Sequence, residues 1–346
     1  MDRKKFLGTL TALSTVALPG KAQMENMEGM DLEEQPVLPS RIPPYLKPGD
    51  TIGITCPAGF ILAEDIAPAV QQIESWGFKV VVGATVGKKD FTFGGTDTER
   101  AADFQQMMDD AKIKAILCAR GGYGMGRMID RLDFKQFLAK PKWVIGFSDI
   151  TVIHNHLSGR YGIASIHSKM CNSFPTDWAL AEPIQVETIL SIKKALMGEK
   201  MRYTAPANAN NRLGTAVGEL TGGNLKMLET LGGTPSDANT DGKILFVEDT
   251  GEYAYSVDRM FWNLKRRGKL KKLKGLIVGG FKLKAEEPGE EFGRTLYEIV
   301  QEVTKEYNYP VCFDFPVGHQ RNNFALKCGV KHRLEVKADG VGMAEL

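Results

Sequence analysis

The stretch WVIGFSDIT, residues 143–151, joins an apolar run to a segment with helical spacing through a short turn that carries Ser148. A buried strand followed by a helix is the repeating unit of a parallel sheet, because parallel neighbours need a crossover connection. The same pattern recurs through the first half of the chain. Strands are expected at about 51–56, 79–82, 113–119 and 143–146, and helices at about 63–76 and 97–110. We therefore predict a doubly wound α/β domain with a mostly parallel sheet at 44–170.

The second half of the chain starts again after the polar stretch ANANNR at 207–212. The segment 171–212 has the composition of a loop with one helix, and it is the predicted linker between two domains. Beyond it, strands are expected near 243–249 and 276–279, and helices near 257–267 and 295–306. We predict a second, smaller α/β or α+β domain at 213–346.

The first residues differ from the rest of the chain. Arg3, Lys4 and Lys5 precede an apolar, uncharged stretch that ends in small residues, which is the layout of an export signal. We predict an export signal at 1–23 and a disordered leader, rich in Met and Glu, at 24–43. No later apolar stretch reaches the roughly 20 residues that a membrane helix needs. The protein is thus expected to be exported, soluble and periplasmic, with the export route open.

The composition indicates a globular chain without a strong overall charge. It has 346 residues, 43% of them hydrophobic, and its 44 basic and 42 acidic residues leave a net charge of +2. This balance gives no field that would attract nucleic acid or an anionic membrane. The dense basic run at 265–274 has no interleaved aromatic residues, so we predict a solvated helix end there. The expected partner is a small molecule.

The cysteines give no sign of a disulfide framework or a metal site. There are five of them, an odd number, and none forms a CxxC pair. They are Cys56, Cys118, Cys171, Cys312 and Cys328. Three lie at the ends of apolar runs, where a cysteine is usually a small buried hydrophobe. We predict structural cysteines, no metal and no cofactor.

Two loops leave the predicted strands of the first domain at the edge where open α/β sheets bind ligands. One is the RGGYG loop, 120–124, whose glycines let backbone N–H groups point at an anion. It fits neither the dinucleotide fingerprint nor a P-loop. The other is the Ser148 turn, 146–151, which resembles a nucleophile elbow except that Ile150 replaces the second glycine. Ser148 is a nucleophile or, in the simpler interpretation, a helix cap.

A serine nucleophile needs a base, and the chain has five histidines. His319 follows an apolar strand and a glycine, and His167 ends another apolar run, so both are candidates for the cleft. His154 and His156 lie too close to Ser148 in sequence and are expected to be structural or exposed. His332 lies in a closing strand with alternating polar residues, which predicts a surface position.

The base in turn needs a carboxylate to orient it. Glu248 ends the apolar run ILFVE, where an acid is costly unless it has a partner. It is therefore a member of a structural ion pair or a catalytic partner, with Asp249 and Glu252 as more solvated alternatives.

Five motifs follow one another along the chain. They are RGGYG at 120–124, GFSDIT at 146–151, GELTGGNL at 218–225, LFVEDTGE at 245–252 and PVGHQRNN at 316–323. In this order they resemble the LD-carboxypeptidase family of serine peptidases, which includes muramoyltetrapeptide carboxypeptidases and microcin C immunity peptidases. The resemblance runs over about 46–346. Two stretches depart from it: HSKM at 167–170, where members usually carry His-Gly-Pro, and ALKCGV at 325–330, near which a Pro-Gly pair is missing.

The resemblance implies a catalytic triad that spans both domains. Ser148 is the implied nucleophile, Glu248 the orienting carboxylate and His319 the general base. The implied oxyanion hole consists of the backbone N–H groups of Asp149 and of a glycine in the RGGYG loop, with Gly122 preferred to Gly121.

A carboxypeptidase must also bind a free terminal carboxylate, for which arginine is a natural partner. Arg120, Arg127 and Arg321 lie in the candidate cleft loops, so each is a candidate for this role. Tyr123 and His167 are further candidates for substrate binding.

The resemblance implies a reaction: cleavage of the L,D-peptide bond before the terminal D-alanine of peptidoglycan tetrapeptides, through an acyl-enzyme. It also implies a homodimer. One alternative is a peptidase acting on a peptidyl-nucleotide antibiotic, with Phe174 and Trp178 as the nearby aromatic candidates for a nucleobase. Others are a non-catalytic protein that binds wall fragments, and an α/β-hydrolase, which would need a second glycine after Ser148.

Overall fold

The computed structural model describes residues 40–346. The predicted export signal and the predicted leader up to residue 39 lie outside the described residues. The last residues of that leader, 40–43, pack on the first domain. Arg41 donates its backbone N–H to the Gly162 carbonyl at 2.6 Å, and its own carbonyl accepts from the Ala164 N–H at 3.0 Å. This part of the leader is therefore ordered.

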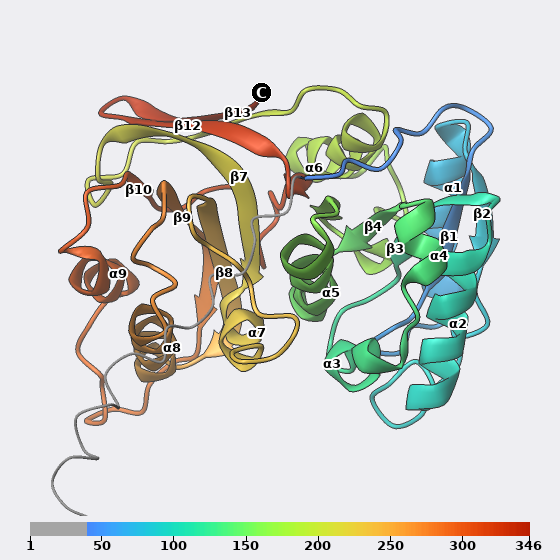
Figure 1. Ribbon diagram of the computed structural model, residues 1–346, viewed down its shortest axis with the longest axis horizontal. Helices are drawn as coiled ribbons and strands as arrows, with labels where there is room; N and C mark the ends of the chain where they lie inside the picture. The colour runs from blue at the N-terminus through green and yellow to red at the C-terminus, as the bar shows by residue number, and fades with distance from the viewer. Residues whose placement is uncertain (1–39) are drawn as a thin grey trace, which may run out of the picture. The chain divides into compact units, whose positions relative to one another are not determined.

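The first sheet has the strand order β11-β5-β4-β3-β1-β2, of which β4, β3, β1 and β2 are labelled in Figure 1. Its strands are β1 (Thr51–Thr55), β2 (Lys79–Val82), β3 (Ile113–Cys118), β4 (Trp143–Gly146), β5 (Ser165–His167) and β11 (Leu326–Cys328). The first five run parallel to their neighbours, and β11 from the far end of the chain is antiparallel to β5. The predicted doubly wound, mostly parallel sheet is confirmed, with one strand that the second half of the chain supplies.

Helices cover both faces of this sheet. They are α1 (Ala67–Ser75), α2 (Asp97–Asp109), α3 (Met125–Met128), α4 (Lys135–Ala139), α5 (Thr151–Asn155) and α6 (Pro183–Leu196). Successive side chains of a strand point to opposite faces. Leu117 of β3 accordingly packs in the core with α1 and α6, whereas its neighbour Ile116 packs in the core with α2 to α5.

The second sheet has the strand order β10-β9-β8-β7-β12-β13-β6. Its strands are β6 (Arg202–Ala205), β7 (Gly214–Asn224), β8 (Ile244–Glu252), β9 (Gly275–Leu283), β10 (Val311–Cys312), β12 (Lys331–Lys337) and β13 (Gly340–Glu345). Strands β7 to β10 are parallel, and β12, β13 and β6 join antiparallel. The helices α7 (Leu225–Thr230), α8 (Ala254–Arg266) and α9 (Leu296–Thr304) share a core with β8 and β9 (Figure 1). The second α/β domain is thereby confirmed.

The expected linker, 171–212, contributes to both sheets. Helix α6 packs in the core of the first sheet, and β6 is the edge strand of the second, where Ala205 pairs with Val341. The consecutive strands β11 and β12 belong to different sheets. One apolar core includes Ile166 of the first sheet and Phe246 of the second. The two domains therefore share a core.

Burial confirms some of the local predictions and contradicts others. All five cysteines are buried and free, as expected. His154 and His156 are buried, so their predicted structural alternative holds. The surface position predicted for His332 is wrong, because its side chain is fully buried on the same face of β12 as Leu334 and Val336. A strand covered on one face buries alternate residues, whatever their polarity.

Two further patterns concern charge and membranes. The basic run at 265–274 begins in the last turn of α8, and several of its side chains are in ion pairs, among them Lys265 with Glu306 at 3.0 Å and Lys272 with Asp241 at 3.0 Å. Within residues 40–346, no helix combines the length and the apolar character that crossing a membrane requires.

Candidate active site

Ser148 lies in a tight turn between β4 and α5. Its φ of 64° is in the left-handed region, which residues other than glycine rarely adopt. Such backbone strain is common where a side chain must be presented for function. The short 3-10 turn Ser148–Ile150 has Phe147 at its N-cap and no side-chain cap. The helix-cap interpretation of Ser148 is therefore wrong, and the strained geometry is that of a nucleophile elbow.

Glu248 and His319 form a short hydrogen bond. Glu248 Oε2 lies 2.5 Å from His319 Nδ1, and the Glu248 side chain is fully buried. An ionised carboxylate only accepts hydrogen bonds, so the ring donates through Nδ1 and keeps Nε2 for proton transfer. The His319 side chain is 18% exposed, which leaves the imidazole accessible at the surface of the site.

Gly318 permits this contact. Its φ is +105°, and a Cβ at this position would lie 2.4 Å from Glu248 Cβ. No other residue type could bring the chain this close to Glu248. On the other side of the loop, Gly318 donates its N–H to Asn323 Oδ1 at 2.8 Å. The pairing of β8 with β9 also shifts register next to Glu248, as bulges near functional sites commonly do.

The ring of Phe147 links the Ser148 turn to the His319 loop, 316–323. The centroids of the Phe147 and His319 rings are 4.9 Å apart, and Phe147 directly precedes Ser148. Among the described residues, no hydrogen bond joins His319 to Ser148. Catalytic hydrogen bonds are often long without substrate and tighten only in the complex. The structure thus places the Glu248–His319 pair of the second domain next to Phe147, the residue before Ser148.

The RGGYG loop runs beside Ser148. A Cβ at Gly121 would lie 3.3 Å from Ser148 Oγ, and the Gly121 carbonyl accepts from the Gly59 N–H at 2.8 Å. In a trans peptide the following N–H points opposite to the carbonyl. The Gly122 N–H therefore points away from the Gly59 N–H.

The carboxylate of Asp149 holds the RGGYG loop in place, a role that the sequence did not reveal. It is buried and accepts the Met125 N–H at 2.7 Å, at the start of α3. Burial raises the pKa of Asp149 to about 6, although the Met125 hydrogen bond and the Arg100 charge oppose the shift. Arg100 is also buried and donates to the Gly124 carbonyl at 2.9 Å. Both side chains fix the far end of the loop.

A buried polar network connects α5, the helix after Ser148, to β8, the strand that carries Glu248. The Asn224 N–H donates to Thr151 Oγ1 at 3.0 Å, and its side-chain amide donates to Asp249 Oδ1 at 2.9 Å. Asp249 also accepts the Lys226 N–H at 2.9 Å, and burial raises its pKa to about 6. Asp249 is therefore committed to this network. The only sequence signal for this network was that Thr151, Asn224 and Asp249 are polar residues within the motifs at 146–151, 218–225 and 245–252.

The arginines considered for substrate binding have other partners. Arg120 donates to the Phe60 carbonyl at 2.8 Å, and Arg127 pairs with Asp97 at 2.8 Å. Arg321 pairs with Glu182 and is 75% exposed. Sequence spacing placed all three near the cleft but could not show these competing partners.

The two other candidates differ in exposure. Tyr123 is 54% exposed and packs on Phe93, with ring centroids 5.8 Å apart. His167 is fully buried, and its ring packs edge-on against Phe147 and Phe246. The prediction that His167 lines the cleft is wrong, because β11 and the second sheet cover the end of β5.

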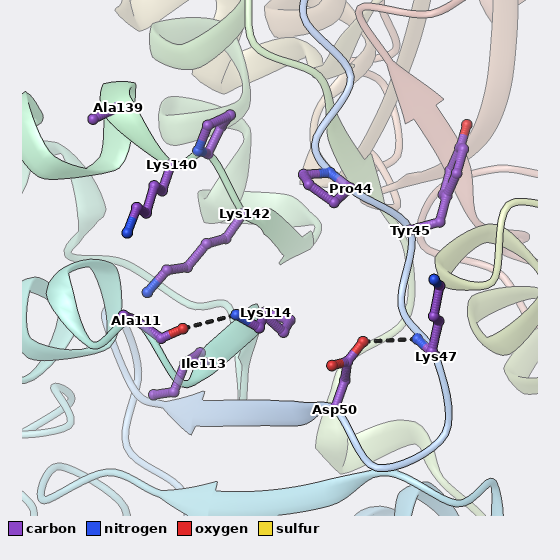
Figure 2. Close-up of a pocket in the computed structure, with 11 residues that line it drawn as sticks. Pro44, Tyr45, Lys47, Asp50, Ala111, Ile113, Lys114, Ala139, Lys140 and Lys142 are labelled. Carbon is purple, nitrogen blue, oxygen red and sulfur yellow. Dashed lines mark hydrogen bonds between the residues drawn. The ribbon is translucent and has the colours of Figure 1, made fainter.

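A separate cavity of about 440 Å³ lies at the opposite ends of the first-sheet strands (Figure 2). Its basic lining residues are Lys47, Lys114, Lys140 and Lys142. Lys142 donates to the Met107 and Asp110 carbonyls at 2.9 and 2.5 Å, and so caps the end of α2. Lys114 donates to the Ala111 carbonyl at 2.8 Å. The ammonium groups of Lys114 and Lys142 thus stabilise the end of α2 and the turn after it. None of the predicted site residues lines this cavity.

Comparison with known proteins places both domains in one family. The models for the LD-carboxypeptidase N-terminal and C-terminal domains match residues 52–168 and 217–334. The probable murein peptide carboxypeptidase of Bacillus subtilis is 33% identical over 291 residues, which cover 84% of this chain and 90% of that protein. The microcin C7 self-immunity protein MccF of Escherichia coli is 27% identical over 328 residues, 86% of this chain and 94% of that protein. The crystal structure of muramoyltetrapeptide carboxypeptidase from Oxalobacter formigenes has a TM-score of 0.76 at 27% identity and covers 85% of this chain and 98% of its own. This chain is therefore a member of the LD-carboxypeptidase family.

Proposed function

We propose that this protein is a serine carboxypeptidase that removes the terminal D-alanine from peptidoglycan tetrapeptides. The observation that carries the proposal is the Glu248–His319 hydrogen bond beside the strained turn of Ser148. The family and the murein peptide and muramoyltetrapeptide carboxypeptidases among its relatives support this substrate class. The bond cleaved is the one between an L-configured centre and the terminal D-residue.

The proposed mechanism is an acyl transfer in two steps. His319 Nε2 takes the proton of Ser148 Oγ as this oxygen bonds to the scissile carbonyl carbon. The N–H groups of Gly122 and Asp149 bind the oxyanion, and each such donor contributes roughly 3 kcal/mol to transition-state stability. His319 then protonates the leaving amine and the C–N bond breaks. Water, activated by the same imidazole, releases the acyl group, while the Glu248 side chain orients the ring.

Mass spectrometry of a purified wall tetrapeptide tests the proposal. Incubation with the wild-type protein should remove one alanine mass, and Ser148→Ala should leave the peptide intact. If neither protein trims the peptide, the tetrapeptide assignment fails. If both trim it equally, Ser148 is not the nucleophile.

Activity on a peptidyl-nucleotide antibiotic has less support from the site. The aromatic candidates for stacking on a nucleobase are Phe174 and Trp178. Phe174 is buried against Trp76, with ring centroids 6.2 Å apart, and Trp178 packs against the apolar core of the first sheet. The buried ring of Phe174 offers no face to a base, and the ring of Trp178 is partly buried. A peptidyl-nucleotide substrate in the same assay should therefore be cleaved more slowly than the tetrapeptide.

We also propose that the protein works outside the cytoplasm as a homodimer. Export is supported by the sequence pattern at 1–23, and the dimer by the family resemblance. Fractionation of cells that produce the full chain would locate it, and light scattering of the purified protein would give its mass in solution. Retention in the cytoplasm, or a mass of one chain, would contradict the respective part.

A further inference from the structure

Lys169 lies at the same edge of the first sheet as Ser148. The strands β4 and β5 end side by side, where Gly146 pairs with His167. Ser148 follows the end of β4 by two residues, and Lys169 follows the end of β5 by two residues. The Ser168 N–H donates to the Gly146 carbonyl at 3.0 Å, which keeps the two loops together beyond the strands.

The Lys169 ammonium group contacts the residues that surround the triad. Its Nζ lies 5.6 Å from the centroid of the Phe147 ring, which is itself packed on the His319 ring. It also donates to the Gln320 carbonyl at 2.7 Å, next to His319 in the chain. An ammonium group has three N–H donors, so two remain beyond the one that Gln320 accepts.

Lys169 differs in this respect from the arginines that were considered for the substrate carboxylate. Arg127 and Arg321 pair with carboxylates, and Arg120 is held by a backbone carbonyl. Lys169 has a carbonyl as its hydrogen-bond partner, and among residues 40–346 no carboxylate lies within ion-pair distance of it. Its charge is therefore not neutralised by direct pairing, and a partly buried charge of this kind attracts an anion more strongly than an exposed one does.

We propose that Lys169 binds the terminal carboxylate of the substrate and thereby restricts cleavage to the last peptide bond. This inference rests on the proposed function, because it adds the carboxylate receptor to the same reaction. The terminal carboxylate lies one residue beyond the scissile carbonyl, about 3.5 Å along an extended chain. A receptor must therefore lie close to the Ser148 turn, where Lys169 lies.

The test compares a tetrapeptide that ends in a free carboxylate with the same peptide ending in an amide. Wild-type protein should have a higher kcat/KM for the acid by about 10- to 100-fold, the range expected for a hydrogen bond to a charged group. Lys169→Met should slow cleavage of the acid by this factor relative to cleavage of the amide. Lys169→Arg should retain most of the preference. Lys282→Met, which removes an exposed charge near Lys169, is the matched control and should also retain it.

The pH dependence provides a second readout. Burial and the nearby Lys282 charge lower the pKa of Lys169 to about 8, while Glu248 opposes the shift. The lysine is cationic at pH 7 and loses its charge as the pH rises through 8. The ratio of acid to amide cleavage in wild-type protein should fall over this range. His319 contacts the same Phe147 ring, but it acts on both substrates alike, so its effect cancels in the ratio.

Three outcomes would overturn the inference. If Lys169→Met keeps the wild-type preference for the acid over the amide, Lys169 is not the receptor. If the variant loses the same factor in kcat/KM for both peptides, Lys169 instead stabilises the His319 loop. A matching loss in Lys282→Met would show that the combined positive charge of this region, and not a direct bond from Lys169, sets the preference. Labelling by a fluorophosphonate, which has no carboxylate, checks that Ser148 is reactive in each variant. If wild-type protein cleaves neither peptide, the proposed function is wrong, and this inference, which rests on it, is wrong as well.

Discussion

At the scale of single residues, we expect the carboxylate of Glu248 to control kcat. Glu248→Gln keeps the size of the side chain but allows the amide to stabilise the wrong tautomer of His319. We expect kcat to fall by about 10³- to 10⁴-fold with little change in KM, as for other triads that lose this carboxylate. Steady-state kinetics on the tetrapeptide would measure it. Glu252→Gln, at the end of the same strand, is the control and should stay within about twofold, a surface-type change.

The buried carboxylate of Asp149 should make the free energy of unfolding depend on pH. Its pKa is about 6 in the folded protein against an ordinary 3.8, so the folded state binds the proton more tightly than the unfolded state does. This group therefore contributes less stability as the pH rises from about 4 to 6. Asp149→Asn should remove that contribution, so the difference in unfolding free energy between variant and wild type should change across this window. Chemical denaturation at several pH values measures it, and a constant difference would contradict the assignment.

At the scale of elements, the His319 loop depends on its closeness to β8. Gly318→Ala would put a Cβ 2.4 Å from Glu248 Cβ at a φ of +105°. We expect a loss of about 1–3 kcal/mol of stability from the strained backbone, together with loss of most activity as the Glu248–His319 contact opens.

Gly342→Ala is the matched control for this loop. A Cβ at Gly342, in β13, meets nothing within 4 Å. Its effect on unfolding should stay within about 0.5 kcal/mol, and activity should not change. Equal effects of the two substitutions, measured by urea denaturation and by tetrapeptide cleavage, would contradict the steric argument.

At the scale of the whole described chain, one buried ion pair joins the two sheets. Lys327 of β11 and Glu345 of β13 lie 2.9 Å apart, and both side chains are buried. Lys327→Met would leave an unpaired buried carboxylate and should cost about 3–5 kcal/mol of stability. The double variant Lys327→Met and Glu345→Met should recover most of the loss. A double variant as unstable as the single one, measured by chemical denaturation, would show that the pair itself is not the cause.

Several features of this protein followed from the sequence because they depend on short-range patterns. The apolar runs and their spacing predicted β1 to β4, and the turn between β4 and α5 predicted the conformation around Ser148. Glu248 stood out for a similar reason, because an acid at the end of an apolar run needs a partner. The buried cysteines also followed from their neighbours along the chain.

Only the tertiary structure decided which strands and side chains, far apart in sequence, contact one another. The sequence could not show that β11 completes the first sheet, which buries the side chain of His167, or that β12 lies inside the second sheet, which buries His332. It also could not show that Gly318 lets His319 reach Glu248, or that Lys169 lies over Phe147. The physical reason is that burial and partner choice depend on contacts between residues far apart in sequence, whereas periodicity reports only the neighbours of each residue.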